Sequence, residues 1–166
     1  GGHTAVMDAG ELLQYRPTAE VFHAPASIRV ARAFSDPPMN LMPARRHPQG
    51  GVRVADSADW PVALPSTLGD DFVLGIRAGG LSVHPRPGDL AIAAEVELAE
   101  IAGSDTFVHV HSPVGELVAQ LTGVHQLGLG ESIVLHLNPD HLFVFDARGP
   151  LVRAPRGPNA GGRPWH

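Results

Sequence analysis

The chain has 166 residues, 43% of them hydrophobic, which is enough to fill the core of one ordinary domain, and its 19 Gly and 16 Pro favour turns and short strands over long helices. It has no cysteine, which excludes disulfides and thiolate chemistry, no apolar run near the roughly 20 residues that span a bilayer, and no signal peptide at its start. The net charge is −5 and all 12 basic residues are Arg, which excludes a broad basic surface for nucleic acid and a phosphate-binding loop, because that loop needs a lysine.

The first elements predicted are a hairpin and two short helices. His3–Asp8 is a short apolar run that ends in an Asp-Ala-Gly turn, and Glu11–Tyr15 follows it as the second strand. A helix is expected to begin near Pro17 and to stop before Pro25, and a second to begin with Ser27 as its N-cap. Helices this short are not stable alone. We therefore interpret them as the end of another domain.

Beyond the Asp36-Pro37-Pro38 break, the pattern changes to closely spaced strands. Turn residues separate short runs rich in Val, Ile, Leu and Phe, which is typical of a small barrel or sandwich. The predicted strands are Met39–Pro43, Gly51–Ala55, Pro61–Leu64, Phe72–Arg77, Phe107–His111, Leu117–Leu121, Ser132–Leu137 and Leu142–Asp146.

One segment, Leu90–Ile101, fits two kinds of element. It is rich in helix formers, but its apolar residues alternate with a period of two from Leu90 to Leu98. We predict a strand, because the surrounding pattern is β. The last segment, Ala147–His166, is rich in Gly, Pro and Arg without a periodic apolar face, and it is predicted to be a disordered tail.

The strings Ala5–Leu12, Pro17–Phe34 and Ser35–Asn40 occur in an order that is typical of one protein family. They resemble segments of the ATP-binding subunits of ABC importers of the carbohydrate and glycerol-phosphate branch. Ala5–Leu12 resembles the strand that follows the switch histidine of these ATPases, and Pro17–Phe34 resembles the two helices that close the ATPase domain. Ser35–Asn40, with the letters SDPPMN, is similar to the linker of this branch.

The later strings match the regulatory domain of the same family. Leu74–Arg77 is similar to its Gly-Ile-Arg-Pro-Glu element, although Ala78-Gly79 replace the last two residues. Gly103–His109 and Asn138–Asp146 resemble a second block and the closing hairpin. Together, the strings cover most of residues 4–146, and their order and spacing make the signal specific.

The resemblance implies a mainly β fold: a small OB-fold-like (TOBE/MOP-like) barrel preceded by a β-hairpin and two short helices left from the ATPase domain. It divides the chain into an ATPase remnant (residues 1–35), a regulatory β-domain (36–146) and the tail (147–166). We expect a truncated, non-enzymatic chain without a cofactor, whose parent would hold ATP and Mg²⁺ upstream of Thr4. The implied partners are a second copy, permease subunits and a regulatory protein, at the cytoplasmic face of the plasma membrane.

Six residues are candidates for a hinge or an interface. The Pro-Pro-Met-Asn string is expected to form a stiff hinge, with Met39 anchoring it to the barrel. Arg77 ends an apolar strand, where it would either pair with a carboxylate across a subunit contact or lie in solvent. The six candidates are Pro37, Pro38, Met39, Asn40, Arg77 and Asp105.

Other residues could carry chemistry but also have ordinary structural interpretations. His109 and His111 lie on one face of a predicted strand, where they would either share a metal ion or be half-exposed. Asp70 and Asp71 are either paired catalytic carboxylates or turn residues, and we favour the turn. Trp60 is expected at a hairpin tip and possible interface. No thiolate or fixed third ligand supports a metal site, and no nucleophile elbow of the G-x-S-x-G type occurs, so no catalytic or metal-binding residue is assigned.

Two alternative functions remain open. The first is an oxyanion-binding or small-ligand-binding barrel like those of molybdate-type importer subunits, which the missing lysine disfavours. The second is a barrel that binds nucleic acid, which the charge of −5 and the 5% aromatic content disfavour.

Overall fold

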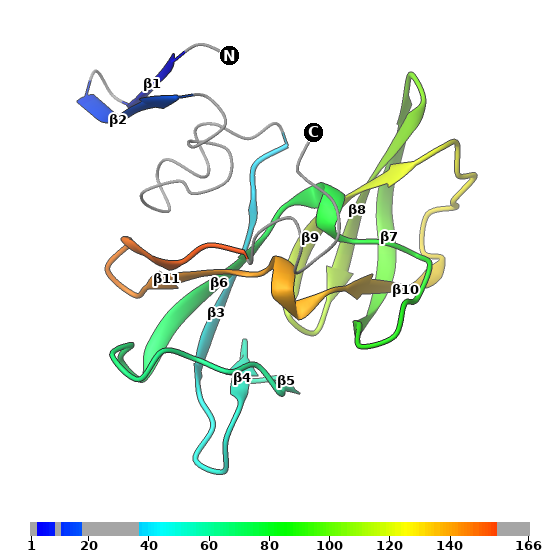
Figure 1. The fold of residues 1–166 in the computed structure, drawn as a ribbon. Coiled ribbons are helices and arrows are strands. Elements are labelled where there is room, and N and C mark those ends of the chain that lie inside the picture. Colours follow the sequence, from blue (N-terminus) through cyan, green and yellow to red (C-terminus); the bar gives the residue numbers. More distant parts are fainter. Residues whose placement is uncertain (1–2, 9–10, 18–36, 156–166) are drawn as a thin grey trace.

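A computed structural model describes residues 3–8, 11–17 and 37–155. Strands dominate this part of the chain, which confirms the prediction of a mainly β, OB-like fold (Figure 1). The predicted hairpin is present: β1 (His3–Asp8) and β2 (Glu11–Pro17) pair antiparallel. The two predicted helices after Pro17 lie outside the described residues.

The larger sheet has six strands, in the order β12-β11-β6-β3-β4-β5, and all of its pairs are antiparallel. Its central strands, β3 and β6, come directly after the linker and after the Gly-Asp-Asp turn. The strands are β3 (Asn40–Arg46), β4 (Val52–Val54), β5 (Ala58–Trp60), β6 (Asp71–Ile76), β11 (Phe143–Asp146) and β12 (Leu151–Arg153).

The second sheet is curled and has four strands, in the antiparallel order β10-β7-β8-β9 (Figure 1). Tight turns join its sequential strands: Gly103 and Gly115 have φ angles of 62° and 114°, a region that favours glycine. Two single-turn 3-10 helices, η1 (Ala78–Gly80) and η2 (Pro139–His141), follow β6 and β10. The strands are β7 (Leu90–Ala102), β8 (Asp105–Ser112), β9 (Gly115–Thr122) and β10 (Ser132–Leu137).

One continuous core joins the two sheets, because alternate residues of each strand point to the same side. Leu74 and Ile76 of β6 pack in the same cluster as Val108 and Val110 of β8, and all four are fully buried. The predicted alternation of apolar and polar residues therefore places the strands around one main core.

The segment rich in helix formers is a strand, β7, as predicted, but its alternation ends earlier than expected. Ile92, Ala94 and Val96 are buried, but Leu98 is 43% exposed. The register of β7 against β8 shifts between Val96 and Leu98, so Glu97 is an extra residue, and the side chains beyond it change face. The prediction that Leu98 shares the inner face was wrong for this reason.

Three other predictions need correction. No strand forms at Pro61–Leu64; the strand lies just before it, at Ala58–Trp60, and proline could not donate to a ladder there. Trp60 pairs with Val52 and is buried in the main core, so it is not an exposed hairpin tip. The predicted disordered tail begins too early, because Leu151–Arg153 forms β12 against β11. Residues 156–166 lie outside the described residues.

Candidate functional site

The linker string enters the larger sheet at β3, and its last two residues are buried. Pro37 is half-buried and Pro38 is exposed, whereas Met39 and Asn40 are 4% and 6% exposed. The two prolines restrict the backbone just before the chain joins the sheet. The anchor of the linker therefore consists of Met39 and Asn40.

Asn40 joins the two sheets through its side-chain amide. Its Nδ2 donates to the carbonyl oxygen of Val118 at 2.9 Å, and its Oδ1 accepts from the Val118 N–H at 2.8 Å. Val118 lies on β9, an edge strand of the four-stranded sheet, whose outer N–H and C=O groups have no neighbouring strand. The Asn40 amide bonds to Val118 as a peptide group of a neighbouring strand would. It therefore ties the start of β3 to β9.

Met39 belongs to a second, smaller hydrophobic cluster on the other face of the larger sheet. It packs with Phe143 and Phe145, whose rings are stacked with centroids 6.2 Å apart. Gly75 makes this packing possible: a Cβ there would lie 2.6 Å from the Met39 Sδ and 3.0 Å from a ring carbon of Phe145. The linker anchor is therefore packed on one side and hydrogen-bonded on the other.

Arg77 adjoins this second cluster, directly after β6. Its guanidinium lies 5.3 Å from the centroid of the Phe143 ring, a distance that allows a cation–π interaction. Only 7% of the residue is exposed, so the interpretation as a solvated strand end was wrong. Burial removes water from the guanidinium and lowers its pKa to about 10, so the side chain is still charged at neutral pH.

Asp105 is separate from the linker. It begins β8, at the tip of the β7–β8 hairpin, and its Oδ2 accepts a hydrogen bond from Gln120 Nε2 at 2.9 Å. The structure thus brings Met39 and Arg77 together at Phe143 and places Asn40 beside them at β9. Asp105 does not join this group.

The remaining candidates occupy outward-facing positions. His109 and His111 share the outer face of β8, and His111 Nδ1 lies 2.9 Å from Glu116 Oε1. In the part of the chain that the structure describes, no cluster of three His, Cys, Asp or Glu residues could hold a metal ion. Asp70 and Asp71 are exposed where β6 begins, as expected of turn residues.

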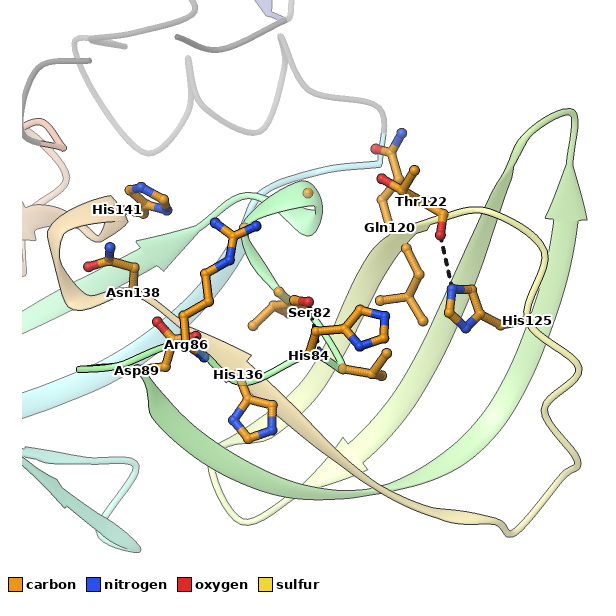
Figure 2. Close-up of a pocket in the computed structure, with 15 residues that line it drawn as sticks. Ser82, His84, Arg86, Asp89, Gln120, Thr122, His125, His136, Asn138 and His141 are labelled. Atoms are coloured by element: carbon orange, nitrogen blue, oxygen red, sulfur yellow. Dashed lines mark hydrogen bonds between the residues drawn. The ribbon is translucent and has the colours of Figure 1, made fainter. Parts of the chain in front are cut away.

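A pocket of about 290 Å³ lies between the segment after η1, the end of β9 and the end of β10 (Figure 2). Sequence reasoning missed it, because its residues come from separate parts of the chain that share no motif. Only the unusual number of histidines, 10 in the chain, could have drawn attention to it. Its polar residues are Ser82, His84, Arg86, Asp89, Gln120, Thr122, His125, His136, Asn138 and His141.

A family model, the TOBE domain, matches residues 74–145, from β6 to β11. Residues 74–145 are a TOBE domain. Its matched range leaves out β3, β4 and β5, yet β3 pairs with β6 along six residues. The sheet of this TOBE domain therefore includes strands that precede the matched range, beginning at the linker anchor.

Similarity to curated proteins extends beyond the TOBE domain and covers most of the chain. The sn-glycerol-3-phosphate import ATP-binding protein of Chromohalobacter salexigens is 36% identical over 153 residues, which cover 89% of this chain and 40% of that protein. The xylose/arabinose import ATP-binding protein of Haloferax volcanii is 30% identical, covering 86% of this chain and 41% of that protein. The chain spans about two fifths of the length of these relatives and matches their C-terminal region.

The chain also has a structural neighbour, the cytoplasmic molybdate-binding protein ModG with molybdate bound. The two share 11% sequence identity with a TM-score of 0.43, over 64% of this chain and 95% of that one. Within the described ranges, no helix has the length and apolar character that a membrane span requires.

Proposed function

We propose that this chain is a regulatory and dimerisation module of the ATP-binding subunit of a sugar-type ABC importer, and that it has no ATP site of its own. The observation that carries the proposal is the match to the C-terminal two fifths of such subunits, including the TOBE domain. The chain has no lysine, and a phosphate-binding loop requires one to reach the terminal phosphates of ATP. ATP and Mg²⁺ would bind elsewhere in the parent protein.

The linker anchor supports a mechanical role. A domain that moved when ATP binds would pull on the Pro37-Pro38 string, whose proline rings fix φ and so limit how far this hinge can bend locally. Asn40 would pass the displacement to β9, and Met39 would pass it to the ring cluster of Phe143. In this proposal, the barrel follows the neighbouring domain as one body.

Dimerisation is supported by apolar side chains exposed near the β7–β8 hairpin. Ile101 lies on the hairpin, on the same face as its register partner Thr106, and is 51% exposed, whereas Leu98, 43% exposed, points to the opposite face beside His109 and is not part of this surface. Val124 and Leu129, which are 59% and 76% exposed, lie on the segment after β9, which is hydrogen-bonded to Thr106 and Val96 of the hairpin. Burying this surface against a second copy would be favourable, because its apolar area would leave water.

The assembly proposed for the parent protein follows from its relatives. Import ATP-binding proteins work beside membrane-embedded permease subunits, so we propose permease contacts and a position at the cytoplasmic face of the plasma membrane for the parent of this chain. The proposal also includes a regulatory protein as a partner of the barrel.

Two measurements on the purified chain test the proposal. Calorimetry with Mg-ATP should give no binding, whereas an affinity of about 1 μM or any ATP hydrolysis would contradict the missing nucleotide site. Size-exclusion chromatography with light scattering should show a dimer that the substitution Leu129→Asp dissociates. The control is Val152→Asp on β12, which is also partly exposed but lies away from the hairpin. If both variants elute like the wild type, the hairpin surface is not the interface.

A further inference from the structure

The two edges of the four-stranded sheet, β9 and β10, are protected to different degrees (Figure 1). On β9, the Asn40 side chain occupies the outer backbone groups of Val118, and Glu116 adds a charge. On β10, the six residues Ser132–Leu137 include no Lys, Arg, Asp, Glu or Pro, the residue types that keep an edge strand from pairing with another chain. The edge strands of the larger sheet, β5 and β12, have only three residues each. Of the edges of these two sheets, β10 is therefore the one best suited to accept another strand.

Ser82 already pairs with one position on the outer side of β10. It forms an isolated antiparallel bridge with His136, with N···O distances of 2.9 and 2.6 Å. Because β7 pairs with the other side of β10, the N–H and C=O of His136 point away from β7. Every second residue of a strand directs its backbone groups to the same side, so those of Ser132 and Val134 also point outward. The bridge therefore shows that this side of β10 can accept an antiparallel strand.

The outer side of β10 is open beyond this bridge, in the part of the chain that the structure describes. Here β10 pairs only with β7 and with Ser82, and no described residue outside the sheet hydrogen-bonds to the backbone of Ser132 or Val134. Both of these residues are exposed, Val134 to 45%. Open backbone groups of this kind can bond to an extended peptide that lies alongside them. Two successive outward-facing positions of β10 are therefore available to such a peptide.

The side chains beside this edge determine which peptide would fit. Val134 is paired with Ala93, so a β-branched apolar residue placed opposite Val134 would continue an apolar row across the strands. Ser132 is paired with Glu95. A residue placed opposite Ser132 would lie two strand spacings, about 10 Å, from Glu95, a gap that an arginine side chain can span across the small serine. The edge thus favours an apolar residue and, two positions along the peptide, a basic one.

We propose that the open edge of β10 binds an extended peptide segment of a partner protein by strand addition, with an apolar residue opposite Val134 and a basic residue opposite Ser132. The backbone hydrogen bonds would supply the affinity, and the two side-chain positions would supply the specificity. Ser82 limits the added strand at one end, so few pairs form and the complex is a transient one. This site goes beyond the proposed regulatory and dimerisation role and does not depend on it.

An NMR titration with the synthetic peptide acetyl-Thr-Val-Thr-Arg-Thr-amide tests the proposal. In the antiparallel arrangement, its valine lies opposite Val134 and its arginine opposite Ser132. We expect saturable shifts of the Ser132 and Val134 amide signals with a dissociation constant of about 1 mM or lower. At saturation, both amide hydrogens should exchange with solvent at least tenfold more slowly, on the order expected for newly formed backbone hydrogen bonds. A peptide with glutamate in place of arginine should bind about threefold more weakly or worse, because attraction to Glu95 becomes repulsion.

Two variants of the edge separate strand addition from other kinds of binding. Val134→Pro removes the outward N–H and leaves the pairing with β7, so peptide binding should weaken at least tenfold. Val134→Lys keeps the backbone but places a charge against the arginine, and it should also weaken binding, by about threefold or more. The matched control is Val152→Lys, on the edge strand β12, which should bind like the wild type.

Three results would overturn the proposal. The first is the absence of saturable binding, and the second is equal binding by the wild type and both Val134 variants. The third is protection of the Ser132 and Val134 amide hydrogens that rises with protein concentration in the absence of peptide, because a second copy of the chain would then occupy this edge.

Discussion

The substitution Asn40→Ala probes the link between the two sheets. It removes both hydrogen bonds to Val118 and leaves the Val118 N–H and C=O without a protein partner at a partly buried edge. Each unsatisfied group costs about 1–3 kcal/mol, so we expect the free energy of unfolding to fall by about 2–4 kcal/mol in urea titrations. The control Asn138→Ala removes one hydrogen bond, to the Asp140 N–H at the start of η2, and should cost about 1 kcal/mol.

A second variant, Asn40→Asp, should make the free energy of unfolding depend on pH. A carboxylate at position 40 can accept from the Val118 N–H but repels the Val118 carbonyl, so burial should raise its pKa in the folded state. A raised folded pKa means that the stabilisation is present below the unfolded pKa and is lost as the pH rises through the folded one. The variant should therefore be closer to wild type at about pH 4 than at about pH 7. A loss below about 0.5 kcal/mol for Asn40→Ala, as for an ordinary surface change, would refute the reasoning.

Three further predictions concern packing, a buried hydroxyl and a histidine. Gly75→Ala places a Cβ 2.6 Å from the Met39 Sδ and should cost about 1–3 kcal/mol in thermal unfolding; an unchanged Tm would contradict the packing. Thr106→Val keeps the side-chain shape but removes two hydrogen bonds to the segment after β9, so amide hydrogens of residues 123–131 should exchange faster with little change elsewhere. The hydrogen bond to Glu116 raises the pKa of His111; NMR titration should show this, and Glu116→Gln should lower it. A histidine whose pKa is raised in the folded state stabilises the fold fully below the unfolded pKa, and this contribution is lost as the pH rises through the folded pKa.

Much of the fold could be predicted from local patterns, because burial on one side of a sheet imposes an alternation with a period of two. The strand β10 is observed at the predicted residues, Ser132–Leu137, and β7 is a strand despite its helix-forming composition. The surrounding sheet decides the second case, since packing between β8 and β10 outweighs the helix propensity of alanine and glutamate. The bulge at Glu97 could not be predicted, because it depends on the register of a partner strand.

The candidate site was only partly predictable, for a related reason. The linker string indicated Met39 and Asn40, but not that an amide would bind the backbone of Val118, 78 residues away. The burial of Arg77 against Phe143 likewise arises from a pairing between β6 and β11. Long-range contacts of this kind leave no periodicity in the sequence.

Sedimentation equilibrium of the chain tests the central claim most directly, because a dimerisation module should associate without nucleotide. We predict a reversible equilibrium between monomer and dimer, with the dimer predominating at high protein concentration and unaffected by Mg-ATP. A single monomeric species at every concentration, with or without nucleotide, would contradict the dimerisation role proposed for this domain.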